Sequence, residues 1–293
     1  MKYLMMLLLL PVLAHASEGD AFSARLFTDY KDMEPLLNDE VNRRMSEALV
    51  KANKKKHACA PEVAIKAMEG EFLRPVVGVF EFWSSHNSVL QGHYIKISNS
   101  IYKDLKISEN WPVQLGKFGM ATFFNVNGTL VASDKFGHFF DEGHTYYDMV
   151  NRQGLPMQDA LNKGISLEEG IYGYERSAVF SYGDLVANRN GYEFWNNLLN
   201  EKDGDNYIGC EDSKFYLRKQ FKFSKYVDDG WDEAINCSKY SNKSVEDRVM
   251  KVIAELEKSS GQKLACPAER EKCAAIVKKY QSEKEYLISP MCY

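Results

Sequence analysis

The amino-acid sequence predicts a mainly α-helical fold with a small β-hairpin element and a disulfide-stapled helical C-terminal region. Three observations favour this fold class. Apolar residues recur at helical spacing in several stretches, an Asn-Gly pair separates two β-prone runs, and five of the six cysteines follow residue 200. Aromatic residues form 13% of the chain, which is typical of a folded protein with a sizeable core.

The N-terminal residues have the features of a secretory signal peptide. Lys2 precedes the apolar run 4–10, and an Ala-His-Ala cleavage signal follows at 14–16. We therefore expect an exported protein, either periplasmic or secreted. No other segment approaches about 18 consecutive apolar residues, so no integral membrane segment is predicted after cleavage. The predicted domains are the signal peptide 1–16, a mainly helical core domain 17–200 and a cysteine-containing helical region 201–293.

The composition makes some partners and cofactors less favoured. A net charge of −4 gives no reason to expect a nucleic acid or an anionic membrane as partner. An even number of cysteines in an exported chain indicates up to three disulfides, whose connectivity the sequence leaves open. The nearest pair suited to a metal, Cys266 and Cys273, lacks the spacing of a zinc site. No cofactor is predicted, and the oligomeric state stays undetermined.

The first third of the chain contains two predicted helices and one predicted strand. We expect residues 17–35 to be loosely held. Residues 33–52 carry apolar side chains at helical spacing, and residues 63–71 form a second, shorter helical pattern. Residues 76–83 are dense in Val and Phe, which predicts a strand or another buried segment.

A β-hairpin and a long helix follow. The Asn-Gly pair at 127–128 favours a type I′ turn, because both central residues of that turn need positive φ. A Ser-Asp pair suited to an N-cap begins a helical pattern at 133–153. Gly137 and Gly143 each cost about 1 kcal/mol inside a helix. We therefore expect another backbone or a ligand to approach closely there.

Capping signals place the remaining helices. A proline opens the helix 156–164, and a capping box formed by Ser166 and Glu169 predicts a short helix that begins there. A second box opens the helix 181–200. Two further helical patterns cover 244–259 and 267–280, the second with a proline at its first position.

The ionisable residues best suited to chemistry lie between positions 133 and 195. Asp134, His138 and Glu142 are spaced i, i+4, i+8 and share one helix face. A carboxylate one turn from His138 favours the imidazolium form and fixes the ring, which prepares a general base or a metal ligand. The alternative is a set of ordinary ion pairs on a helix surface. We favour this alternative for the pair His144 and Asp148.

A polar centre is also predicted, which we define as Asp134, Lys135, His138, Asp184 and Asn188. Asp184 and Asn188 are one helical turn apart, and Asn188 falls on a helix face where an apolar residue is expected. A buried Asp-Asn pair must be hydrogen-bonded to be tolerated. Lys135 and His138, on the helix predicted at 133–153, are the expected partners. This arrangement explains the spacing without catalysis.

A glycosidase interpretation uses carboxylates of the same region. Such an enzyme needs one carboxyl group kept protonated by an apolar pocket and a second that is ionised. Glu142, Glu175 and Asp184 are the candidates. Tyr182 and Trp195 could stack on sugar rings, but core packing explains these aromatic residues equally well.

A metal interpretation is the third possibility. It combines His138 with Glu142 or Asp134 and takes a third ligand from Glu175 or Asp184. Two ligands one turn apart on a helix are mechanically sound for a metal such as zinc. However, a His-x-x-x-Glu pattern is common by chance, and no metalloprotease signature is present.

The two motifs together resemble a known pattern. They read Asp134-Lys135-x-x-His138-Phe139 and Phe180-Ser181-x-x-Asp184-Leu185-x-Ala187-Asn188-x-x-Gly191. The pair is similar to the DKxxHF…FSxxDLxANxxG pattern of secreted bacterial envelope proteins of unassigned function, which are distantly VanZ-like. The resemblance covers about sixty residues and implies an all-helical polar centre in an envelope setting, without a reaction or a substrate. VanZ-like proteins are membrane-embedded, whereas this chain has no predicted spanning helix after cleavage.

We therefore expect an exported cell-envelope protein with a non-catalytic or binding role and a structural polar centre. Two alternatives stay open, and whether the protein is an enzyme is undecided. One is a carboxylate-dependent hydrolase of cell-wall glycan, with Glu142 or Glu175 as the acid and Asp184 or His138 as its partner. The other is a metal-dependent hydrolase. Peptidoglycan or another envelope glycan is the expected partner class. The predicted binding residues are Asp134, Lys135, Asn188, Tyr182 and Trp195.

Overall fold

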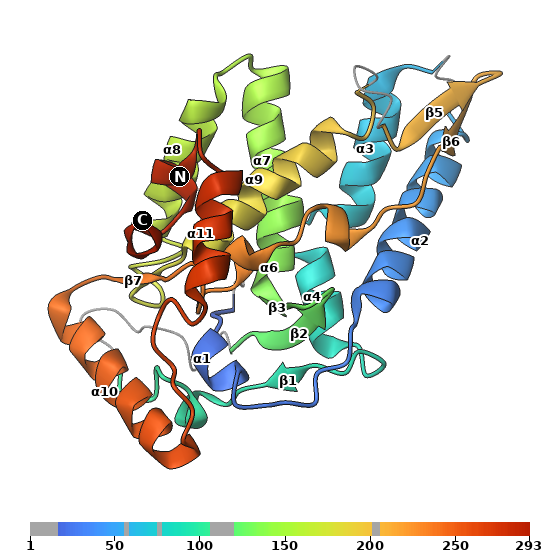
Figure 1. Ribbon diagram of the computed structural model, residues 1–293. Helices are drawn as coiled ribbons and strands as arrows, with labels where there is room; N and C mark the ends of the chain where they lie inside the picture. The colour runs from blue at the N-terminus through green and yellow to red at the C-terminus, as the bar shows by residue number, and fades with distance from the viewer. Residues whose placement is uncertain (1–16, 56–58, 75–77, 106–119, 201–205) are drawn as a thin grey trace, which may run out of the picture.

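The computed structural model describes residues 17–55, 59–74, 78–105, 120–200 and 206–293, and the predicted signal peptide lies outside them. The described chain is mainly helical, as predicted, and has three small antiparallel sheets where one hairpin element was predicted (Figure 1). None of its helices is both long enough and apolar enough to cross a bilayer.

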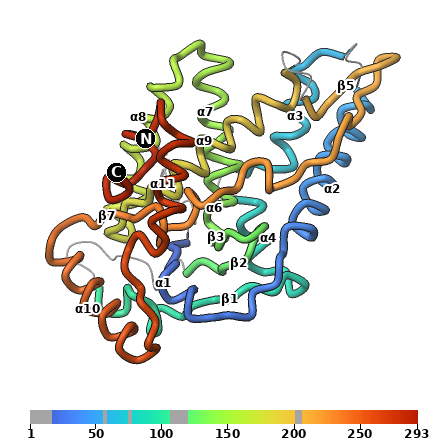
Figure 2. Tube along the Cα trace, in the orientation of Figure 1, coloured from blue at the N-terminus to red at the C-terminus, as the bar shows by residue number. Residues whose placement is uncertain are grey.

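Two of the N-terminal helices, α2 (Glu34–Ala52) and α3 (Pro61–Phe72), are close to those predicted. The described residues before 120 also form α1 (Ala21–Ala24), α4 (Val79–His86) and the 3-10 turn η1 (Ile97–Asn99). Helix α2 and strand β6 (Lys214–Leu217) lie side by side, with α10 (Lys243–Ser260) at the opposite side of the molecule (Figure 2). Asn42 fixes the segment after β6 to α2, because its amide exchanges two hydrogen bonds with the backbone of Phe221.

The predicted hairpin is confirmed. Strands β2 (Thr122–Val126) and β3 (Thr129–Ala132) pair through Asn127 and Gly128, whose φ angles are +51° and +89°. Both values are positive, as a type I′ turn requires. Strand β1 (His93–Tyr94) adds a third strand beside β2. The other sheets pair β4 (Val179–Phe180) with β7 (Lys239–Tyr240), and β5 (Ile208–Glu211) with β6.

The helix predicted at 133–153 is present but is not a regular α-helix. It consists of α6 (Asp134–Gly137), the π-helical η2 (His138–Glu142), α7 (Gly143–Tyr147) and the π-helical η3 (Asp148–Arg152). Segments of π-helix are rare and occur frequently at functional sites. Ser133 does not cap this helix, because its hydroxyl instead accepts a hydrogen bond from the backbone N–H of Thr122.

Helix α9 (Tyr182–Asn196) packs directly against this irregular helix. A Cβ added to Gly143 would lie 2.5 Å from Gly191 Cα, and one added to Gly191 would lie 1.9 Å from the carbonyl oxygen of Phe139. The predicted close approach at Gly143 is therefore the backbone of α9. As predicted, α9 begins at Ser181, whose hydroxyl accepts from the N–H of Asp184.

Of the two structures predicted for 76–83, a strand or another buried segment, the second is present from residue 79 as a helix with Phe80 and Glu81 buried, because a short apolar run does not distinguish a strand from a buried helix. Three other local predictions were wrong. Residues 17–35 are not loosely held, since they include the buried helix α1 and a bridge to Met120. No separate helix forms at 166–169, because α8 (Met157–Glu168) continues through Ser166. Helix α11 (Arg270–Lys279) begins three residues after Pro267.

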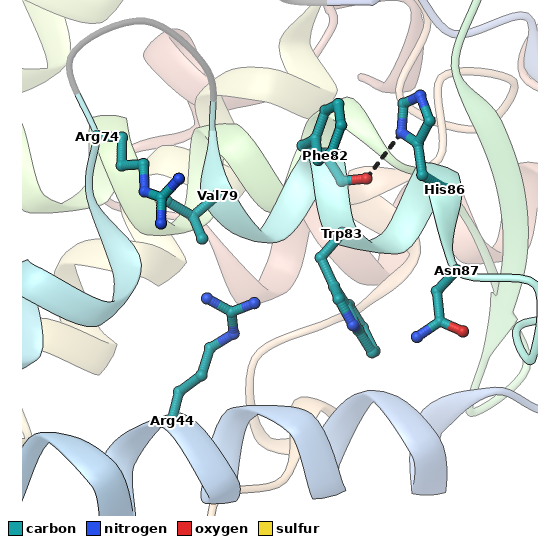
Figure 3. A pocket seen from close by; sticks show the side chains of 7 residues that line it. All are labelled: Arg44, Arg74, Val79, Phe82, Trp83, His86 and Asn87. Atoms are coloured by element: carbon teal, nitrogen blue, oxygen red, sulfur yellow. Dashed lines mark hydrogen bonds between the residues drawn. The ribbon is translucent and has the colours of Figure 1, made fainter.

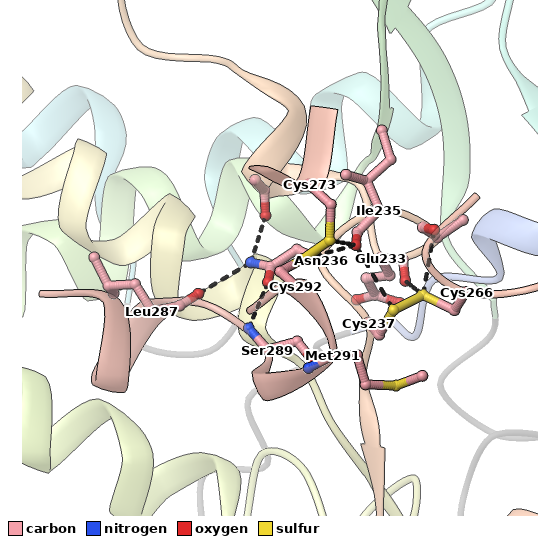
Figure 4. The surroundings of a disulfide bond; sticks show 12 residues. Glu233, Ile235, Asn236, Cys237, Cys266, Cys273, Leu287, Ser289, Met291 and Cys292 are labelled. Carbon is pink, nitrogen blue, oxygen red and sulfur yellow. Dashed lines mark hydrogen bonds between the residues drawn. A yellow bond between two sulfur atoms is a disulfide. The ribbon is translucent and has the colours of Figure 1, made fainter. Parts of the chain in front are cut away.

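The C-terminal region is joined to the rest of the chain by disulfides and hydrogen bonds. All six cysteines are paired, as Cys59–Cys210, Cys237–Cys266 and Cys273–Cys292. Buried Asn236 donates to Leu287 O at 3.0 Å and accepts from Ser289 N at 2.9 Å, beside two of the disulfides (Figure 4). These bonds hold the segment that carries Glu233. The short helices of this region are η4 (Phe223–Lys225), η5 (Asp229–Trp231), α12 (Lys284–Leu287) and η6 (Pro290–Cys292).

Candidate functional site

The ammonium group of Lys135 is the core of the site. Its Nζ lies 2.7 Å from Asp134 Oδ2, 2.6 Å from Asp184 Oδ1 and 2.7 Å from Glu233 Oε1. The Lys135 side chain is 1% exposed. Burial lowers the tendency of an ammonium group to be charged, but three carboxylates outweigh burial and hold the pKa of Lys135 well above its ordinary value. Lys135 is therefore a permanent buried cation.

His138 and Asn188 complete the predicted polar centre. His138 Nε2 lies 3.1 Å from Asp184 Oδ2, and His138 Nδ1 lies 3.0 Å from Asn188 Oδ1. Burial by itself lowers the pKa of His138, but the charge of Asp184 and its hydrogen bond raise this pKa to about 10. The convergence of Lys135 and His138 on Asp184 and Asn188 is the arrangement that the helical spacing predicted.

The amide orientation of Asn188 is set by the backbone carbonyls beside it. With Oδ1 toward His138 Nδ1, this oxygen also lies 3.0 Å from the carbonyl oxygen of Asp184 and 3.3 Å from that of His138, and neither of these acceptors can bond to it. If the amide is rotated, its nitrogen donates to both carbonyls and lies 3.0 Å from His138 Nδ1.

Asp184 is the ionised member of the centre. Burial by itself raises its pKa, but the positive charges of His138 and Lys135 hold the pKa of Asp184 well below its usual range. Ser181 connects this helix end to the C-terminal region, since its hydroxyl donates to Glu233 Oε1 at 2.6 Å while it caps Asp184.

Two carboxylates that sequence reasoning missed, Glu168 and Glu233, extend the centre. Glu168 accepts a hydrogen bond from the Ser181 N–H at 3.2 Å, and burial together with the charge of Asp184 raises its pKa to about 8. Burial raises the pKa of Glu233 to about 7, although the charge of Lys135 opposes this rise. Both groups therefore hold or share a proton near neutral pH.

A second group of acids lies beside the polar centre. Glu81 of α4 accepts hydrogen bonds from the N–H and hydroxyl of Ser17. Burial and the charge of Asp134 raise the pKa of Glu81 to about 7. Burial likewise raises the pKa of Asp141 and of Glu142. The charge of this region is thus kept low by proton uptake as well as by Lys135 and His138.

The remaining predicted residues are scattered. Glu175 is exposed, whereas Glu142 is half-buried, so these two candidates do not share the environment of Asp184. Tyr182 and Trp195 are 3% and 0% exposed, and the indole N–H of Trp195 donates to the carbonyl of Phe140 at 2.9 Å. Their predicted roles in catalysis and sugar binding stay predictions.

His144 and Asp148 do not pair with each other in the described contacts. His144 Nε2 lies 3.0 Å from Glu69 Oε1, and Asp148 Oδ1 lies 3.4 Å from a guanidinium nitrogen of Arg152. Arg152 also contacts Glu69 at 2.7 Å. These residues form an ion-pair network between the irregular helix and α3, which agrees with the structural role favoured for them.

Two groups of side chains in this region have the spacing of a metal site. The ligand atoms of His138, Glu168 and Asp184 lie within 4.8 Å of one another, and so do those of Asp134, Asp184 and Glu233. In the second group the Lys135 ammonium is already within 2.7 Å of all three carboxylates. The first group is free of the Lys135 ammonium, but metal binding there requires His138 and Glu168 to lose their protons. It uses Glu168 where the sequence suggested Glu142, Asp134 or Glu175.

Comparison with known proteins adds no relative. No family model matches the chain, and no curated protein or solved structure matches it significantly.

Proposed function

We propose that this protein is an exported cell-envelope protein with a binding role, in which the polar centre is structural. The observation that carries the proposal is the environment of Lys135. Its ammonium lies within 2.7 Å of three carboxylates and its side chain is 1% exposed, so its hydrogen-bonding capacity is used inside the protein. A substrate has no side from which to approach it.

The contacts of the centre also connect distant parts of the chain. Asp134 and Lys135 belong to the irregular helix, Asp184 to α9, and Glu233 to the disulfide-linked C-terminal region. A buried ion network of this kind contributes more to the choice of one arrangement than to net stability, because desolvation cancels much of the Coulomb energy. This is the behaviour expected of a structural centre.

Export is supported by the cysteines and the N-terminal sequence. Three disulfides suit an oxidising compartment, and the sequence of residues 1–16 is that of a signal peptide. An envelope glycan is then an accessible ligand class.

Incubation of the purified protein with insoluble peptidoglycan tests this proposal. We expect the protein to sediment with the glycan without releasing reducing ends. Glu168→Gln should behave like the wild type, because Gln replaces a carboxyl group that is largely protonated at neutral pH and keeps an acceptor for the Ser181 N–H. Release of reducing ends by the wild type that Glu168→Gln abolishes would instead establish a glycan hydrolase with Glu168 as its acid.

A metal-dependent hydrolase is the second candidate, and the trio of His138, Glu168 and Asp184 favours it. Elemental analysis of the purified protein decides between the two candidates. One equivalent of a transition metal that is lost in His138→Gln would support the metal site. Absence of metal after dialysis against zinc or manganese, with a folded protein, would contradict it.

A further inference from the structure

A cavity of about 400 Å³ lies between α2 and α4, and no residue of the polar centre is among the described residues that line it (Figure 3). It falls within the volume range of small-ligand sites. Arg44 of α2 and Arg74, which follows α3, extend into it from two sides, and α4 contributes Phe82, Trp83 and His86.

The cavity carries uncompensated positive charge. Among the described residues that line it, none is acidic. Arg74 is exposed, and no described side chain forms an ion pair or a hydrogen bond with its guanidinium. Two guanidinium groups that face one space repel each other unless an anion lies between them. The planar guanidinium group forms its best paired hydrogen bonds with a carboxylate or a phosphate.

Arg44 is held in place before any ligand arrives. Its Nε donates to Glu40 Oε1 at 2.7 Å, and its Nη1 donates to the carbonyl of Glu71 at 3.0 Å. Its side chain is 10% exposed. Glu40 also pairs with Arg43, which in turn pairs with Glu47, so two carboxylates balance Arg43 and Arg44. The unmatched charge of the cavity is therefore that of Arg74.

The aromatic residues form the apolar part of the cavity. Phe82 is 54% exposed and stacks on the His86 ring with centroids 4.2 Å apart, while His86 Nδ1 is bonded to the carbonyl of Phe82. Trp83 is half-buried and leans on Phe80 at 5.1 Å. An exposed ring held rigidly by its own helix is suited to cover the apolar face of a ring-shaped ligand.

We propose that this cavity binds a sugar that carries a carboxylate or a phosphate, with the anion between Arg44 and Arg74 and the ring against Phe82 and Trp83. This inference rests on the proposed binding role and names its ligand class. The anion supplies the charge that the cavity lacks, and the cavity volume accommodates a single sugar or a short oligosaccharide end.

Calorimetric titration of the full chain tests the proposal with four probes, namely glucuronic acid, glucose 1-phosphate, glucose and inorganic phosphate. We expect both charged sugars to bind, and glucose to bind at least tenfold more weakly. Arg74→Gln should weaken the charged sugars at least tenfold, and Phe82→Ala should weaken them without affecting inorganic phosphate. Arg248→Gln on α10 is the control, because it removes the same charge on the opposite side of the molecule.

Several outcomes would overturn the proposal. Unchanged affinity in Arg74→Gln, equal binding of glucose and glucuronic acid, or no binding of either charged sugar at about 1 mM would each do so. Inorganic phosphate binding as tightly as glucose 1-phosphate would remove the sugar from the proposal. A failure of the proposed function would be seen in a different experiment. Glycan hydrolysis that depends on Glu168 would contradict a structural polar centre and would leave the affinities of the cavity for these sugars unchanged.

Discussion

The polar centre and the α2–α4 cavity are opposite solutions to placing charge in a protein. Around Lys135, each cation is matched by carboxylates within 3.1 Å, and the exposed fractions are small. In the cavity, Arg74 is exposed and faces Arg44 without an acidic neighbour in the lining that the structure describes. In the polar centre the charged groups contact one another, whereas in the cavity the Arg74 guanidinium is exposed to solvent.

This difference assigns different roles to the two regions. A charge that is fully paired and desolvated fixes the relative positions of the helices that carry it. An exposed and unmatched charge contributes little to folding and is free to attract a ligand. On our proposal, the richest concentration of ionisable side chains in the sequence is therefore the structural region, and a sparser surface is the candidate for binding.

The largest expected effect is the replacement of Lys135 in the polar centre. Lys135→Met leaves three carboxylates without their cation, and we expect the free energy of unfolding to fall by about 3–5 kcal/mol. Adding Glu233→Gln should recover part of the loss, because one uncompensated carboxylate is removed. Urea denaturation measures both changes.

Lys66→Met on α3 is the matched control, since Lys66 is exposed. It should change the free energy of unfolding by less than about 0.5 kcal/mol. A loss below about 1 kcal/mol in Lys135→Met would show that the centre does not hold the fold.

The contact between Gly143 and Gly191 should give the next largest effect. Gly191→Ala places a methyl group 1.9 Å from the Phe139 carbonyl, so α9 must move away from the helix that carries His138. We expect a loss of about 1–3 kcal/mol, as for other overpacked sites. Gly70→Ala is the control, because nothing lies within 4 Å of the added Cβ and alanine favours the helix by about 1 kcal/mol. Equal stability of the two variants in thermal unfolding would contradict a packing role for Gly191.

Sequence reasoning located the inner part of the polar centre but not its full extent. The spacing of Asp184 and Asn188 on one helix face was enough to infer partners on the helix predicted at 133–153. Glu233 lies 98 residues from Lys135, and its approach depends on how the C-terminal region docks. No periodic pattern contains that information, so this carboxylate could not be predicted.

The cavity was missed for a different reason. Residues 76–83 were interpreted as a strand or another buried segment, because they are dense in Val and Phe, which are β-prone. Val79, Phe82, Trp83 and His86 are spaced i, i+3, i+4, i+7, which is the pattern of one helix face. The local signal was therefore present, but a short apolar run does not decide between the two structures.

Stability should also depend on pH, through groups in and beside the polar centre. The pKa of Glu168 rises from 4.5 to about 8 on folding, and that of His138 from 6.5 to about 10. Each group binds its proton more tightly in the folded protein, so its contribution to stability is full below the unfolded pKa and is lost as the pH rises through the folded value. We therefore expect the thermal unfolding midpoint to decrease as the pH is raised from 5 to 10, by about 2–4 °C for each kcal/mol of stability lost.

The variant His138→Gln isolates one part of this pH dependence. In this variant no stability is lost through deprotonation of the imidazolium between pH 6.5 and 10. The stability lost through deprotonation of Glu168 at lower pH remains. The slope of the thermal midpoint above pH 8 should therefore become flatter. An unchanged slope in that range would show that His138 does not titrate there.

The smallest expected change in the free energy of unfolding comes from replacing Arg74 in the cavity. Arg74→Gln should change the free energy of unfolding by less than about 0.5 kcal/mol, because its guanidinium is exposed and has no partner among the described residues. Arg44→Gln should cost about 1.5–3 kcal/mol, since it breaks charge-assisted hydrogen bonds to Glu40 and to the Glu71 carbonyl. Urea denaturation of the two variants therefore separates a structural arginine from a ligand-binding one. If Arg74→Gln proved as destabilising as Arg44→Gln, the cavity would belong to the structural part of the molecule.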